Sequence, residues 1–215
     1  GVIKTLPATD ALEAKAVSIC LSHPFGVASA FRLGSGKPRW VDTFFGGCYK
    51  KEVFRKIGYF NEKLLRSQDF EFNMRLRAIG GKILLVPDIV AIYYPQATLS
   101  GFLKHNFEDG IWATYPLKFG VVFKTRHYIP LIFVLGIFSL GVFSLFLPLA
   151  YLFFKLAIIS YLSLAMFFSL RAVIKEKNIR IAPLVFLAFL ARHFGYGLGS
   201  IWGLVKIFFK NETVI

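Results

Sequence analysis

The stretch best suited to chemistry is residues 68–71 (Gln-Asp-Phe-Glu), which place two carboxylates two residues apart. Ser67 stands before them at an N-cap position and two glycines follow at 80–81, so the sequence predicts a helix over 68–79. Asp69 falls in the first turn, where the helix dipole favours an ionised carboxylate. Such a group can take a proton from an attacking hydroxyl. On spacing alone, however, Asp69 is better explained as a helix-start residue that balances the dipole.

The elements around this stretch alternate between helical and strand patterns, which predicts a mixed α/β region. Residues 10–13 (Asp-Ala-Leu-Glu) have the form of a capping box and predict a helix to about residue 22. The other expected elements are a strand at 41–45, a short helix over 50–57, strands over 82–86 and 89–94, and an amphipathic helix over 98–115 whose aromatic residues suit a membrane surface.

The second half of the chain is far more apolar than the first. The whole sequence is 56% hydrophobic with a mean hydropathy of +0.59, which is unusual for a soluble domain. Long uncharged runs predict about three transmembrane helices, near 129–147, 149–170 and 181–205, with Pro148 at the first turn. The third run contains Arg192 and His193, so an interfacial or re-entrant helix is its alternative. Four glycines in this run would allow close helix packing: Gly195, Gly197, Gly199 and Gly203.

The formal net charge of +14 does not predict a nucleic-acid partner, because the basic residues form no stripe with interleaved aromatics. Many of them flank the apolar runs, as the positive-inside rule expects of cytoplasmic segments. The turn near Pro148 is then expected outside. The two groups expected in the cytoplasm are Lys118, Lys124, Arg126 and His127, and Arg171, Lys175, Lys177 and Arg180.

Two linked motifs resemble a known family. Residues 46–62 (Gly-Gly-Cys-Tyr-Lys-Lys-Glu-Val-Phe-Arg-Lys-Ile-Gly-Tyr-Phe-Asn-Glu) are similar to the segment that precedes the catalytic base in family 2 glycosyltransferases with a GT-A fold. Residues 68–77, followed by the two glycines, resemble that family's Glu-Asp-x-Asp-Leu-x-x-Arg-Leu pattern. The membrane-bound branch of succinoglycan-type exopolysaccharide assembly resembles the chain best, and residues 194–199 (Phe-Gly-Tyr-Gly-Leu-Gly) are similar to its last helix.

This resemblance implies an inverting sugar transfer from a nucleotide-sugar donor to a lipid-linked or polysaccharide acceptor. Asp69 matches the family's general base, and Glu71 matches its second acidic position, where an exposed helix face is an equal alternative. Gly46 and Gly47 would let backbone approach the acceptor sugar, with a plain tight turn as the alternative. The implied location is the cytoplasmic side of the inner membrane, in a multi-pass protein in contact with membrane lipids.

Trp112 is the remaining candidate for substrate binding. Processive members of the family carry a Gln-x-x-Arg-Trp motif on an interfacial helix, and residues 108–112 (Glu-Asp-Gly-Ile-Trp) match it only at the tryptophan. The departure at the other two positions argues against a processive synthase and suits an enzyme that adds one sugar. The alternative for Trp112 is a residue that only anchors the helix at the membrane interface.

The family's divalent metal, Mg²⁺ or Mn²⁺, is expected to bind an Asp-x-Asp motif that this chain does not contain, since residues 1–20 show no such motif. We therefore expect the chain to be a C-terminal portion that lacks the donor site. A non-catalytic membrane accessory protein is the alternative, and a transporter has less support because the apolar runs show no repeat. The expected divisions are an acceptor-side GT-A-like part at 1–97, an interfacial helix and linker at 98–128, transmembrane helices at 129–205, and a tail at 206–215.

Overall fold

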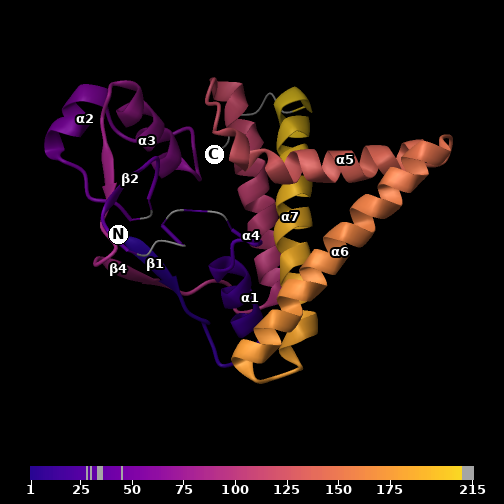
Figure 1. The fold of residues 1–215 in the computed structure, drawn as a ribbon. Helices are drawn as coiled ribbons and strands as arrows, with labels where there is room; N and C mark the ends of the chain where they lie inside the picture. The colour runs from indigo at the N-terminus through magenta and orange to yellow at the C-terminus, as the bar shows by residue number, and fades with distance from the viewer. Residues whose placement is uncertain (28, 30, 33–35, 45, 210–215) are drawn as a thin grey trace.

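The computed structural model describes residues 1–27, 29, 31–32, 36–44 and 46–209 (Figure 1). An α/β part lies at one side and a group of long helices at the other, with α1 and α4 between them. In chain order the elements are β1 (Val2–Thr5), α1 (Leu12–Ser22), β2 (Arg39–Val41), α2 (Lys51–Ile57), α3 (Gln68–Ala78), β3 (Ile83–Leu85), β4 (Val90–Tyr93), α4 (Leu99–Thr114), the 3-10 helices η1 (Tyr115–Phe119) and η2 (Thr125–His127), α5 (Ile129–Phe143), α6 (Pro148–Glu176) and α7 (Ile181–Phe209).

The α/β part is mixed, as the sequence predicts, with two small sheets. Strand β1 pairs in parallel with β4, so that Val2 lies opposite Val90, and β2 pairs antiparallel with β3. A cluster of apolar side chains from β1, β3, α3 and the segments on either side of β2 forms its core: Val2, Ile3, Phe31, Phe44, Leu76, Ile83 and Leu85. Because β1 and β4 are separated by more than eighty residues, this pairing joins the two ends of the α/β part.

Most local elements begin and end close to the predicted positions, but three details differ. Ala11 stands at the N-cap of α1 and no side chain caps this helix, so the capping box predicted at 10–13 is wrong. Ser67 precedes α3, yet its backbone is left-handed (φ 62°) and its side chain makes no capping hydrogen bond, so the predicted cap is wrong. Thr98 does cap α4, because its hydroxyl accepts a hydrogen bond from the Gly101 amide at 3.1 Å. The strand predicted at 41–45 lies earlier, at β2, and Phe45 falls outside the described residues.

Helices α4 and α7 pack lengthwise through glycines. A methyl group added at Gly110 of α4 would overlap the carbonyl oxygen of Tyr196, and one added at Gly199 of α7 would overlap that of Phe107. The Thr114 hydroxyl also donates to the carbonyl oxygen of Ser200 at 2.8 Å. Close approach of this kind requires small residues, as the glycines of the third apolar run predict.

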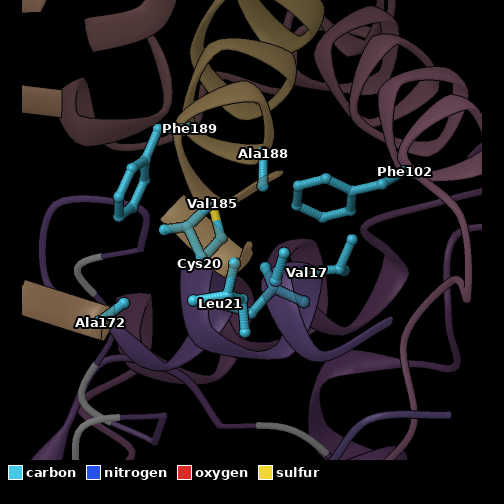
Figure 2. Packing of buried hydrophobic residues seen from close by; sticks show 10 residues of the cluster. Val17, Cys20, Leu21, Phe102, Ala172, Val185, Ala188 and Phe189 are labelled. Carbon is cyan, nitrogen blue, oxygen red and sulfur yellow. The ribbon is translucent and has the colours of Figure 1, made fainter. Parts of the chain in front are cut away.

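This packing corrects the expected position of α4. Phe102 and Tyr115, predicted to face a membrane surface, are 1% and 3% exposed. Phe102 instead lies in an apolar cluster that joins α1, α4, α6 and α7, where Val17 and Cys20 of α1 meet Val185 and Phe189 of α7 (Figure 2). Helix α1, which precedes the apolar half of the chain, is therefore packed against the third apolar run.

The two longest helices, α6 and α7, have the length and composition of membrane spans, whereas α5 does not. At about 1.5 Å per residue, the 15 residues of α5 cover about 22 Å, less than the roughly 30 Å of a hydrocarbon core. It ends at Phe143, four residues before the predicted end of the first span. The turn that follows is apolar and exposed, with Leu145 78% and Phe146 76% accessible.

The direction of α4 bears on the orientation of α7. The two helices run the same way, since Phe102 packs near Val185 and Thr114 reaches Ser200. The basic residues after α4 therefore lie toward the far end of α7, and those before α7 lie at its start. Both groups can share one side of a membrane only if α7 lies along that side. The packing thus favours the interfacial alternative for the third apolar run.

The glycine contact predicts a specific loss of stability. Gly199→Ala should lower the free energy of unfolding by about 1–3 kcal/mol, the usual effect of overpacking, because the added methyl meets backbone that cannot rotate away. Gly136→Ala in α5 is the matched control, since a methyl there meets no atom within 4 Å. Thermal melts of both variants in detergent, followed by circular dichroism, measure the difference. Equal melting temperatures would contradict the close-packed interface.

The ends of α6 should lie on opposite sides of the membrane, with α5 and the exposed apolar turn after it together making the other crossing. Single cysteines at Pro148 and at Lys175 can be introduced into a Cys48→Ser background. The native Cys20 thiol is buried and its pKa is raised to about 12, so it should not react. A membrane-impermeant maleimide added to intact cells should label the cysteine at 148 and, only after permeabilisation, the one at 175. Labelling of intact cells at 175, or at neither position, would contradict this orientation.

Candidate active site

Asp69 lies in the first turn of α3, and its Oδ1 accepts a hydrogen bond from the Phe70 amide at 2.9 Å. The segment before α5 lies against the start of α3. The centroid of the Phe70 ring is 5.0 Å from that of His127 and 6.4 Å from that of Phe123. Burial raises the pKa of Asp69 above its ordinary value, and the backbone hydrogen bonds oppose that change. A carboxylate with a raised pKa is a stronger base for a hydroxyl proton than an exposed one.

Asn73, one turn beyond Asp69 on α3, binds residues on both sides of the glycine pair at 46–47, here called the glycine segment. Its side-chain amide donates to the Thr43 hydroxyl at 3.1 Å, and its oxygen accepts from the Tyr49 hydroxyl at 2.9 Å. Thr43 and Tyr49 flank Gly46 and Gly47, so a single fully buried asparagine anchors both sides of the segment. The structure therefore brings the segment to the face of α3 that carries Asp69.

Tyr49 is close enough to Asp69 to sense its charge. Burial raises the pKa of Tyr49 to about 12, and the nearby Asp69 carboxylate adds to this effect. The phenol is therefore a neutral donor at physiological pH, and it donates to Asn73. Neither Tyr49 nor Asn73 was among the residues singled out from the sequence. The signal for Asn73 was its position, four residues after Asp69 on one helical face.

Gly46 and Gly47 differ in whether the structure has room for a side chain at their positions. Gly46 has φ +59°, which favours glycine, and a side chain there would meet nothing within 4 Å. Gly47 has no room, because a methyl group would overlap the ring of Phe44, a buried member of the α/β core. Both glycines are exposed, so the segment can meet a ligand, but the structure equally accounts for them as a tight turn.

Glu71 is only 7% exposed. Its two oxygens accept hydrogen bonds from Arg75 at 2.6 and 2.9 Å. Arg75 also donates to the carbonyl oxygens of Ile57 and Tyr59, which close the end of α2. This arrangement favours a role for Glu71 in joining α2 to α3 rather than in contacting an acceptor.

Trp112 lies on α4, half-buried, with its ring 5.7 Å from that of Tyr115. The same face of α4 carries Glu108 and Asp109, and both are ion-paired with Arg66, three residues before Asp69. The NH1 atom of Arg66 lies 2.9 Å from Asp109 Oδ1. The structure therefore connects the two helices that carry Asp69 and Trp112, although Arg66 was not predicted as a site residue.

Two further features bear on where ligands could bind. A pocket of about 590 Å³ lies at the opposite end of α3 from Asp69, lined by Arg77, Gly80, Gly81, Trp40 and Lys82 among others. No group of three or more metal-binding side chains occurs within the described residues. Asp69 and Glu71 do not fit a shared divalent metal either, because both oxygens of Glu71 are held by Arg75.

Comparison with known proteins supports a glycosyltransferase relationship. The chain is 25% identical over 111 residues to a dolichyl N-acetyl-alpha-D-glucosaminyl phosphate 3-beta-D-2,3-diacetamido-2,3-dideoxy-beta-D-glucuronosyltransferase of Methanococcus voltae. The match covers 51% of this chain and 34% of that enzyme, so the chain spans about a third of the relative's length. No family model matches the sequence, and no solved structure matches it.

The burial of Asp69 predicts that its replacement does not destabilise the protein at neutral pH. Its folded pKa lies above the unfolded value, so ionisation costs stability once the pH exceeds the unfolded pKa. Asp69→Asn removes this cost and keeps the hydrogen bond from the Phe70 amide. Its melting temperature should equal or exceed that of the wild type at pH 7, and any advantage should shrink as the pH falls toward 4. A clear loss at pH 7 would show that the carboxylate itself stabilises the fold.

Proposed function

We propose that this chain supplies the acceptor-side part of an inverting glycosyltransferase of the family 2 type. The acceptor is a lipid-linked or polysaccharide sugar, and the donor is a nucleotide sugar. The observation that carries the proposal is Asp69, a half-buried carboxylate with a raised pKa at a helix start. It stands beside an exposed glycine segment that the same helix anchors through Asn73. The likeness to a transferase that acts on a dolichyl-phosphate-linked sugar supports a lipid-linked acceptor.

In the proposed reaction, an acceptor hydroxyl oxygen attacks the anomeric carbon of the donor. The new carbon–oxygen bond forms as the bond to the nucleoside diphosphate breaks, and the pair of electrons leaves with the diphosphate. Asp69 takes the hydroxyl proton on a carboxylate oxygen, so charge does not build up on the attacking atom. The raised pKa of Asp69 suits this role, because a base with a pKa nearer the working pH holds the transferred proton better.

Mg²⁺ or Mn²⁺ is part of this proposal as the partner of the donor diphosphate. Among the described residues no group of three metal-binding side chains occurs, and Asp69 and Glu71 do not share one site, so no step of the proposed reaction is assigned to the metal through these residues. Trp112 offers an aromatic face for the acceptor sugar or its lipid link on the side of α4 that faces the catalytic helix.

The proposed location is the cytoplasmic side of the cell membrane. Large apolar side chains on α5 and α6 are exposed, and such a contiguous surface requires cover by lipid or protein. Examples are Ile132, Phe138, Leu149, Leu152, Phe153 and Phe167. Nucleotide sugars are made in the cytoplasm, so a base on that side would meet the donor.

Asp69→Asn should abolish transfer while leaving donor binding nearly unchanged. Membranes containing the full-length protein can be incubated with radiolabelled UDP-, GDP- and dTDP-sugars in turn, and the label counted in the chloroform–methanol extract. Loss of a general base lowers the rate by about 10²–10⁴-fold, because asparagine keeps the shape but takes no proton. This loss should appear in kcat without a matching rise in KM.

Asp10→Asn is the matched control, since Asp10 is an exposed aspartate just before the start of α1. It should retain full activity. An Asp69→Asn variant with more than about a tenth of the wild-type rate would exclude Asp69 as the base. Donor binding without any transfer by the wild type would instead support the non-catalytic accessory role.

A further inference from the structure

An ion-pair cluster joins the catalytic helix to the long helices. Arg66 projects from the loop before α3, and its two terminal nitrogens bind different carboxylates of α4: NH1 lies 2.9 Å from Asp109, and NH2 pairs with Glu108. The three side chains are between 31% and 37% exposed, so they are partly shielded from water. The planar fork of an arginine holds two acceptors in a fixed geometry, which a lysine cannot do.

The cluster continues from α4 into α7. The other oxygen of Asp109 lies 3.4 Å from His105 Nε2 and 4.0 Å from Arg192 NH1. Arg192 also donates to the side-chain oxygen of the fully buried Asn106 and, at 3.3 Å, to the carbonyl oxygen of Gly26. An arginine within an apolar helix is costly unless it is paired, and here the partners come from α4 and from the chain after α1.

The positions of these residues in the sequence show which elements the cluster connects. Arg66 precedes Asp69 by three residues and lies just before the start of α3, whereas Glu108 and Asp109 lie one turn before Trp112 on α4. Helix α4 is in turn fixed against α7 through the glycine contacts. The cluster is therefore a polar link between the carboxylate at the start of α3 and a rigid pair of long helices.

We propose that Arg66 is a positioning residue, which holds Asp69 at a fixed distance from the α4–α7 pair through Glu108 and Asp109. This inference rests on the proposed function, since the distance matters because a lipid-linked acceptor would present its hydroxyl at a set height above the bilayer. Arg66 does not touch the acceptor or take a proton. It acts by keeping the base within reach of that hydroxyl.

Kinetics of the full-length protein in membranes test the catalytic consequence. Arg66→Ala should lower kcat by about 10- to 100-fold, the effect of a misplacement near 1 Å, while KM for the nucleotide sugar changes by less than about twofold. The kcat of Arg66→Lys should lie between those of the wild type and Arg66→Ala, because a lysine ammonium group keeps the positive charge but cannot bind two carboxylates in a fixed geometry. Arg55→Ala, which removes an exposed arginine from α2, is the matched control and should leave both constants unchanged.

A charge exchange separates positioning from simple loss of folding. Arg66→Glu should be at least as inactive as Arg66→Ala, because it places three carboxylates together. Adding Glu108→Arg should restore the rate at least about fivefold over Arg66→Glu alone, as expected of a direct pair with a coupling energy near 1 kcal/mol. No recovery in the double variant, or a wild-type kcat in Arg66→Ala, would overturn the proposal while leaving the proposed function untouched.

Spin-label distances test the link without any assay of sugar transfer. Nitroxides can be attached at Arg77→Cys on α3 and Lys104→Cys on α4, two exposed positions, in a Cys48→Ser background. The distance distribution should broaden in Arg66→Glu and narrow again when Glu108→Arg is added. If the wild type transfers no sugar, the proposed function fails but this measurement still decides the link. An unchanged distribution in Arg66→Glu would overturn it.

Discussion

The glycine contact between α4 and α7 is the constraint on which the position of the site depends. Gly110 and Gly199 bring two backbones together without intervening side chains, so neither helix can rotate without a clash. This fixes which face of α4 looks outward, namely the face that carries Glu108 and Asp109. Because those carboxylates hold Arg66, a contact between two apolar helices determines where the loop before Asp69 lies.

Helix α3 is held by buried polar groups on two sides. Asn73 binds Thr43 and Tyr49, and Arg75 binds Glu71 together with the chain end of α2. Buried polar atoms are costly without partners, so each of these links tolerates only one orientation of the helix. Asp69 is the exception, since its side chain accepts a hydrogen bond from the neighbouring Phe70 amide. A carboxylate that is buried but not committed to a cation is the group in this helix best placed to accept a proton.

The sequence predicted what depends on neighbouring residues and missed what depends on distant ones. Helices α1 to α4 lie close to the ranges predicted from local patterns, α2 and α3 end beside glycines, and the glycines of α7 correctly indicated close packing. The left-handed backbone at Ser67 could not be read from its type, because serine usually caps a helix with its side chain. The Arg66 link spans 42 and 43 residues of sequence, beyond any local pattern. Glu71 looked like a second site carboxylate because spacing does not reveal its pairing with Arg75.

The long helices divide into two kinds, and this division bears on where the proposed base, Asp69, would lie relative to a membrane. Helices α5 and α6 expose apolar side chains along much of their length, so they present the surface that suits lipid. Helix α7 instead buries one face against α1 and α4, and Arg192 on it binds Asn106 and approaches Asp109. A helix with charged partners on one face and apolar side chains on the other belongs at the boundary between protein and bilayer. Since Asp109 also binds Arg66, the proposed base Asp69 would lie near that boundary, where a lipid-linked sugar would present its hydroxyl.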